Sequence, residues 1–134
     1  YKGAPILYSL GNFIFQNDTV KWQPSYNYDE IGLDHAFTPA DFYDKRSDEG
    51  KRGFPGDPIY WQSVVAQIKF ENGKLSSLDV VPIDMGYGKP RSMTGRPLIA
   101  SGKIAAQALS RMKDLSEDMG TGVSIVGNRG IVTI

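Results

Sequence analysis

Apolar and polar residues alternate most clearly over residues 62–83. One face of an extended chain carries four apolar residues before residue 71, and Asn72-Gly73 follows directly. This dipeptide favours a type I′ turn, because both of its positions tolerate a positive φ. The pattern predicts a β-hairpin whose first strand directs these side chains to one side: Val64, Ala66, Ile68 and Phe70.

The predicted turn fixes the register of this hairpin. It places Glu71 opposite Lys74 on the wet face and Phe70 opposite Leu75 on the dry face. The apolar phase then shifts along the return strand. A bulge near Ser76-Ser77 accounts for this shift, and so does burial of both faces of the strand.

Residues 1–16 form a second apolar stretch, which we expect to be a strand. Tyr8–Phe15 is interrupted once, by Gly11-Asn12. Glycine inside a strand often marks a bulge or a close backbone approach, and asparagine tolerates unusual backbone angles. The break predicts either a bend that directs Asn12 toward a site or a structural bulge that satisfies its own backbone.

Residues 17–61 have no clear period and are rich in proline, aspartate, tyrosine and glycine. A structureless segment of this length is unusual inside a compact domain and often carries function. Its aromatic side chains argue against disorder. We expect it to be a long excursion from the fold, with a short helix near 39–45, because Thr38-Pro39 fits an N-cap followed by proline at the first helical position.

The C-terminal third predicts a loop, a helix and a hairpin. Residues 84–96 are rich in glycine, proline and arginine. Residues 97–119 have the apolar period of an amphipathic helix, with Pro97 near its start and Gly120 as its stop. The inward face of this helix would comprise Leu98, Ala105, Leu109, Met112, Leu115 and Met119. A small hairpin over 123–134, with its turn at 127–130, closes the chain.

The composition narrows the class of protein. The 134 residues suit one domain of the α+β class, and 15 basic residues balance 15 acidic ones. A zero net charge does not indicate a nucleic-acid partner. No apolar run approaches the roughly 20 residues of a membrane span. Cysteine is absent and His35 is the only histidine, so this chain alone is not expected to build a two-metal hydrolase site.

The order of motifs resembles one known family. Tyr1–Phe15 is similar to the strand pair after the final histidine motif of the CapA family, the bacterial capsule or poly-gamma-glutamate synthesis proteins. Agreement continues in the same order through three further stretches, which together with the first span nearly the whole chain: Trp61–Ala66, Gly95–Ala100 and Leu115–Thr121. The Tyr-Ser-Leu-Gly-Asn-Phe motif is fairly specific, whereas the others are weak alone.

The resemblance implies a β-rich fragment of an α/β calcineurin-like metallophosphoesterase fold. The family's metal-binding motifs lie upstream of the matching region, so residues 1–134 would be the C-terminal part of a longer CapA-like domain. It further implies a parent that acts in capsule or poly-gamma-glutamate biosynthesis at the bacterial cell envelope, on its extracytoplasmic side. The parent would be a metal-dependent phosphoesterase or hydrolase using Mn, Zn or Fe, whereas this chain alone would hold no metal and be inactive.

Four residues are candidates for contacting a substrate: Ser9, Asn12, Arg91 and Arg96. The resemblance implies that Asn12 lies near the metal centre of the parent, with Ser9 on the same strand. Arg91 and Arg96 flank a loop before the predicted helix, where guanidinium groups and a helix N-terminus suit phosphate or carboxylate. Alternatively, both arginines tie the loop to the body of the fold. No residue of this chain is predicted to be catalytic.

The expected partners are the remainder of the parent chain and an anionic polymer or phosphate-containing substrate. The alternative function is a non-catalytic β-rich module that binds an envelope polymer or a partner protein through residues 17–61. Tyr60 and Trp61 could then stack on sugar rings, although packing at the start of a strand is the favoured interpretation. His35 and the acidic residues near it are expected to form a solvated loop.

Overall fold

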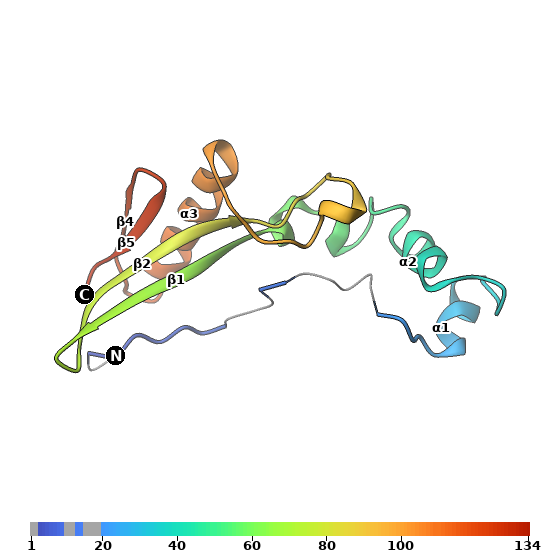
Figure 1. The fold of residues 1–134 in the computed structure, drawn as a ribbon, viewed down its shortest axis with the longest axis horizontal. Coiled ribbons are helices and arrows are strands. Elements are labelled where there is room, and N and C mark those ends of the chain that lie inside the picture. Colours follow the sequence, from blue (N-terminus) through green and yellow to red (C-terminus); the bar gives the residue numbers. More distant parts are fainter. Residues whose placement is uncertain (1–2, 10–12, 15–19) are drawn as a thin grey trace. The chain divides into compact units, whose positions relative to one another are not determined.

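The computed structural model describes residues 3–9, 13–14 and 20–134 (Figure 1). Contacts divide the chain into two compact units, residues 1–14 with 62–134, and residues 15–61. In the described residues the fold is mixed α/β, with a five-stranded antiparallel open sheet and three α-helices. The relation to a metallophosphoesterase fold stays a prediction.

The sheet of the first unit is built around the predicted hairpin. Strand β1 (Gln62–Glu71) pairs with β2 (Lys74–Asp84), and the sheet continues through β5 (Arg129–Val132) to β4 (Val123–Val126). The short strand β3 (Leu98–Ile99) also pairs with β2, opposite Ile83 and Asp84. Strand β2 is therefore central, while β1 lies at one edge of the described sheet.

The hairpin register follows the sequence closely. Asn72 and Gly73 have φ values of 51° and 76°, as a type I′ turn requires. Glu71 pairs with Lys74, and Phe70 pairs with Leu75. The next pair is Lys69 with Ser77, so Ser76 is the extra residue of a β-bulge. The predicted register and bulge are confirmed.

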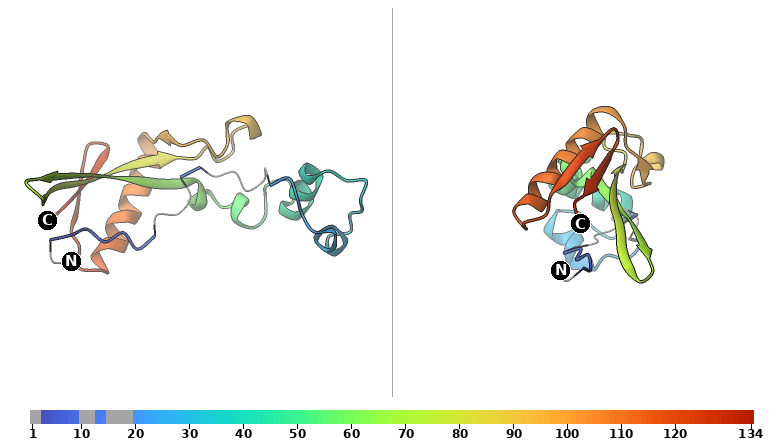
Figure 2. Two further views of the ribbon diagram at one scale, coloured as in Figure 1. Left: turned by 60° about the horizontal axis from the view of Figure 1, so that its bottom comes forward. Right: turned by 90° about the vertical axis from the view of Figure 1, so that its left-hand side faces the viewer.

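Helix α3 (Gly102–Glu117) packs on the sheet, where it contacts β2 and β4 (Figure 2). The buried core joins Leu109 of this helix to three residues of the strands: Leu78, Val80 and Val123. Gly130 on β5 lies beneath them. A Cβ atom there would overlap Val80 Cγ2 and would lie 3.1 Å from Val123 Cγ1. The helix can approach the sheet this closely because β5 has no side chain at this position.

The C-terminal hairpin is confirmed over β4 and β5, with a tighter turn than predicted. Only Gly127 and Asn128 connect the strands, and Gly127 has a φ of 58°. The Asn128 side chain donates a hydrogen bond of 2.7 Å to the carbonyl oxygen of Ala100. This bond ties the turn to the segment that leads into α3.

The predicted helix over 97–119 is too long at its start. Leu98 is in β3, and Ser101 has the extended angles of an N-cap, with φ of −139°. Pro97 therefore precedes a strand, whose pairing with β2 satisfies backbone groups that a helix would have used otherwise. The stop is confirmed, since Gly120 has a φ of 72° and its N–H donates to the carbonyl of Glu117 at 2.8 Å.

Five side chains predicted to face the core are exposed instead: Ile68, Phe70, Leu98, Leu115 and Met119. Phe70 lies near the turn of the hairpin, and Leu115 and Met119 lie at or beyond the end of α3. The pattern gave the correct period for each element. It could not show that the strands and the helix extend beyond the surface that covers them.

The predicted strand over residues 1–16 is not present in its described part. Residues 3–9 and 13–14 belong to no strand, and Ile6, Leu7 and Tyr8 are exposed. An extended segment becomes a strand only when a neighbour satisfies its backbone groups. Within the part of the chain that the structure describes, no strand pairs with it.

The described residues of the second unit form two short helices, α1 (Ser25–Glu30) and α2 (Pro39–Ser47). Helix α2 confirms the predicted N-cap at Thr38 and extends beyond the predicted end. Helix α1 was missed because its sequence has no apolar period. Two 3₁₀ turns follow, at Phe54–Gly56 and Pro58–Trp61.

We expect Gly130→Ala to destabilise the first unit by about 1–3 kcal/mol, the usual cost of overpacking a filled core. The added methyl group would overlap Val80, which is fully buried. Urea unfolding followed by circular dichroism measures the change. Ser124→Ala, at an exposed position on the adjacent strand, is the control and should change stability by less than about 0.5 kcal/mol.

Candidate functional site

The predicted substrate-contacting residues fall in two regions of the first unit. Ser9 is exposed in the described part of the N-terminal segment. Asn12 and the adjacent Gly11 lie outside the described residues, so their predicted role near a metal centre stays a prediction. Arg91 and Arg96 lie together in the loop over residues 85–96, between β2 and β3.

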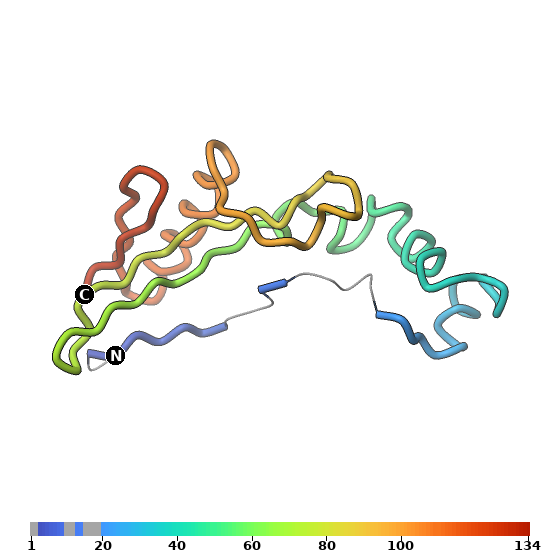
Figure 3. Tube along the Cα trace, in the orientation of Figure 1, coloured from blue at the N-terminus to red at the C-terminus, as the bar shows by residue number. Residues whose placement is uncertain are grey.

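This loop, which we call the basic loop, is closed by short backbone contacts. The N–H of Gly95 donates to the carbonyl oxygen of Met85 at 2.8 Å. At its base, the N–H of Gly86 donates to Asp84 Oδ1, also at 2.8 Å. Figure 3 shows the chain turning back on itself here before it returns along β2 as β3.

Gly86 sets the tight packing of the basic loop. Its φ of 83° is in the left-handed region that favours glycine. A Cβ atom at this position would lie 2.9 Å from the carbonyl oxygen of Met93 and 3.5 Å from Cγ of Lys89. The backbone at Met93 and the aliphatic stem of Lys89 therefore converge on the same point of the loop.

Arg91 and Arg96 are both exposed on this loop, but they do not stand at a helix N-terminus. Arg91 begins the 3₁₀ turn Arg91–Met93, which is held by a 2.7 Å hydrogen bond from Met93 N–H to the Pro90 carbonyl. Strand β3 separates Arg96 from α3. The predicted role of the two guanidinium groups in binding phosphate or carboxylate stays a prediction.

Sequence reasoning missed Lys89, which adds a third exposed cation to the same loop. Its signal was available in the sequence, because the segment from Met85 to Arg96 contains no aspartate or glutamate. A zero net charge for the whole chain concealed this local excess. The charge distribution along the chain would have been the more informative quantity.

His35 is an exposed residue of the turn between α1 and α2. The carboxylate of Asp34 accepts a hydrogen bond from the N–H of Ala36 at 2.8 Å, which forms a local turn. Within residues 3–9, 13–14 and 20–134, no group of three or more histidine, aspartate or glutamate residues could hold a metal ion.

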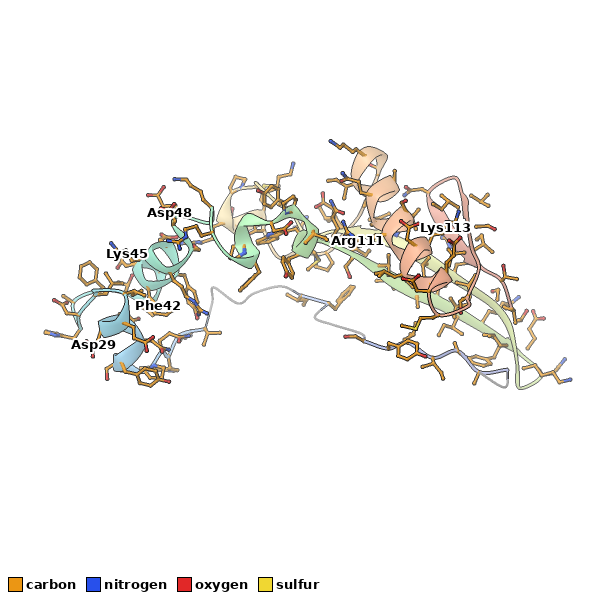
Figure 4. The ribbon with its side chains drawn as sticks, turned by 180° about the vertical axis from the view of Figure 1, so that it is seen from behind. Asp29, Phe42, Lys45, Asp48, Arg111 and Lys113 are labelled. Atoms are coloured by element: carbon orange, nitrogen blue, oxygen red, sulfur yellow. The ribbon has the colours of Figure 1, made fainter. Side chains whose placement is uncertain are left out.

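Several aromatic side chains of the second unit support its own fold, whereas five others are exposed: Trp22, Tyr26, Phe37, Phe54 and Tyr60. Phe42 of α2, labelled in Figure 4, is buried. Its ring centroid lies 5.0 Å from that of Tyr28 on α1. Tyr43 accepts a hydrogen bond of 2.7 Å from the side chain of Gln23. Trp61 is half-buried, and its indole N–H donates to the carbonyl oxygen of Pro55 at 3.0 Å. This contact favours the packing interpretation for Trp61.

The pKa of one carboxyl group in the second unit is shifted by its structural role. Asp41 Oδ2 accepts hydrogen bonds from the hydroxyl of Thr38 at 2.6 Å and from its N–H at 2.8 Å. The hydroxyl first, and then the N–H, lower the pKa of Asp41 below its usual value. These contacts form the capping box at the start of α2.

Two proteins of known sequence are similar to the whole chain, and no family model matches it. They are "Uncharacterized protein y4sH" and "Uncharacterized protein y4uA" of Sinorhizobium fredii, each 34% identical over 153 residues. The match covers 100% of this chain and 30% of each relative. The chain thus spans less than a third of the length of these relatives, and neither name assigns a function.

We expect Thr38→Ala to destabilise α2 by about 1 kcal/mol through loss of the N-cap, whereas Thr38→Ser keeps the hydroxyl and most of the stability. The chemical shifts of residues 39–47 measure the helix population.

The stability of α2 should also depend on pH through Asp41. Because the folded pKa of Asp41 is lowered, its contribution to the stability of α2 is complete above the unfolded value of about 3.9 and is lost as the pH falls through the folded value. A helix population independent of pH between 5 and 2 would contradict this account.

Proposed function

We propose that this chain is the C-terminal part of a CapA-like protein of capsule or poly-gamma-glutamate biosynthesis. Within the parent, it supplies sheet strands, a packing helix and one wall of a cleft. The parent works at the cell envelope as a metal-dependent phosphoesterase or hydrolase whose metal ligands lie upstream. Support for the family assignment is the ordered series of motifs beginning with Tyr-Ser-Leu-Gly-Asn-Phe at Tyr8–Phe13.

One structural observation supports the view that the chain completes a larger domain. The apolar stripe of α3 is buried at Ala105 and Leu109, but it continues to Leu115, which is 59% exposed, and Met119, just beyond the helix, is 61% exposed. The hairpin shows the same behaviour, since Phe70 near its turn is 56% exposed. Both elements extend past the core that they share.

Large apolar side chains left uncovered at both ends of a core favour a further layer of protein. The greater length of the two Sinorhizobium relatives is consistent with such a layer. In the parent, Ile6, Leu7 and Tyr8 would join this larger sheet and acquire the strand partner that the described residues do not supply.

The substrate-contacting roles of Ser9, Asn12, Arg91 and Arg96 belong to this proposal. In the parent, a metal would activate a water molecule and stabilise the charge that develops on the substrate. The residues of this chain would orient an anionic substrate in the cleft and would not carry out the chemical step.

The complete reading frame tests the proposal most directly. We expect an Asp-x-His element, an Asn-His element and a His-x-His element, in that order, upstream of the codon for Tyr1. Sequencing the gene through its start codon provides the measurement. A frame without these histidines would reject the family assignment.

The isolated chain should have no phosphoesterase activity on a chromogenic phosphodiester with added manganese or zinc. Turnover that His35→Ala abolishes would overturn the assignment.

The exposed apolar surface of the isolated chain should cause self-association, measured by sedimentation velocity. Leu115→Lys with Phe70→Lys should shift the distribution toward monomer, whereas Lys113→Ala with Lys69→Ala should not. A monodisperse, cooperatively melting monomer would argue against the proposal that this chain is part of a larger domain.

A further inference from the structure

Positive charge is concentrated in one continuous part of this neutral chain. From Met85 through Lys113 the sequence has no aspartate or glutamate, but it has six lysines and arginines: Lys89, Arg91, Arg96, Lys103, Arg111 and Lys113. The balancing acidic residues lie before and after this stretch. Lys113, at the end of this stretch, lies 3.7 Å from Glu117, so the excess of cations is clearest on the basic loop.

Three of these cations lie on the basic loop. Lys89 and Arg96 form no ion pair with any residue that the structure describes. The nearest carboxylate along the chain, Asp84, stands at the base of the loop, where one of its oxygens accepts from Gly86. Lys89 and Arg96 therefore present charge that the described residues do not neutralise.

The same loop also exposes apolar side chains. Tyr87 is 45% exposed and Met93 is 52% exposed. The close approach of Gly86 to Met93 and Lys89 brings these residues to one small region. Strand β3 follows at once, with Leu98 48% and Ile99 73% exposed.

Basic and apolar side chains together indicate a particular type of surface. A soluble polyanion would use the cations but would gain nothing from exposed methionine and isoleucine. An anionic bilayer uses both, since its phosphates bind lysine and arginine while apolar and tyrosine side chains enter the headgroup region.

We propose that the basic loop, together with β3, docks the first unit on an anionic lipid surface. Lys89, Arg91 and Arg96 contact lipid phosphates, and Met93 and Ile99 enter the interface beside them. The loop is suited to this role because its backbone is already closed by the contact between Gly95 and Met85. Docking requires no metal, so vesicle binding tests it separately from the proposed hydrolytic function, although Arg91 and Arg96 belong to both proposals.

Co-sedimentation of the full chain with lipid vesicles tests this proposal. We expect binding to vesicles of phosphatidylcholine with 30% phosphatidylglycerol, on the order of tenfold weaker binding to pure phosphatidylcholine, and loss of binding at high salt. Lys89→Glu with Arg96→Glu should reduce binding at least tenfold. Lys21→Glu with Lys74→Glu, which makes the same change in net charge elsewhere, should have much less effect.

The apolar contribution needs its own variant. Met93→Ser with Ile99→Ser should weaken vesicle binding severalfold at constant charge, whereas Ile125→Ser with Val126→Ser should not. Circular dichroism checks that each variant is folded. Lys89→Arg with Arg96→Lys keeps both positive charges and should retain vesicle binding. Equal binding to both vesicle types, equal losses in the control variants, or no effect of the apolar variant would overturn the proposal. Binding to soluble poly-glutamate but not to vesicles would instead identify a polyanion site.

Discussion

The close contact of Leu109, Val80 and Val123 over Gly130 is the interaction on which the first unit depends. Helix α3 crosses strands from two separate hairpins, and these strands need a common surface for the helix to approach. Gly130 provides this surface because β5 has no side chain between the buried methyl groups. The Asn128 side chain supports the same contact from the adjacent turn, by fixing the segment before α3. The position of α3 therefore follows from one missing side chain and one hydrogen bond on the C-terminal hairpin.

Features governed by neighbouring residues were predictable from the sequence. Asn72-Gly73 dictates its turn because few other residues accept two positive φ values, and the turn then fixes the pairs Glu71–Lys74 and Phe70–Leu75. Thr38 and Asp41 likewise form their capping box within one helical turn. In each case the interacting groups lie within a few residues of each other, so the sequence carries the required information directly.

Features that depend on distant partners were not predictable in the same way. Pro97 and Leu98 fit the apolar period of a helix, but the free edge of β2 pairs with Leu98 and Ile99 as a strand. Ile6, Leu7 and Tyr8 have the composition of a buried strand but belong to no strand in the described structure. For the candidate site, the sequence correctly identified a loop bearing Arg91 and Arg96. It could not show that β3 separates this loop from the helix.

Two kinds of exposed apolar surface in the first unit call for different explanations. Leu115, Met119 and Phe70 continue stripes that begin inside the core, so further protein of the same chain would extend an existing packing arrangement. Tyr87 and Met93 continue no such stripe. They lie on a loop that is closed by its own backbone contacts, near Lys89 and Arg96, which form no ion pair with the described residues. A protein layer over this loop would have to bury Lys89 and Arg96 or supply carboxylates to meet them, whereas a bilayer surface leaves their charges in contact with phosphates and water. The distribution of charge therefore distinguishes the surface that favours a protein neighbour from the surface that favours a lipid one.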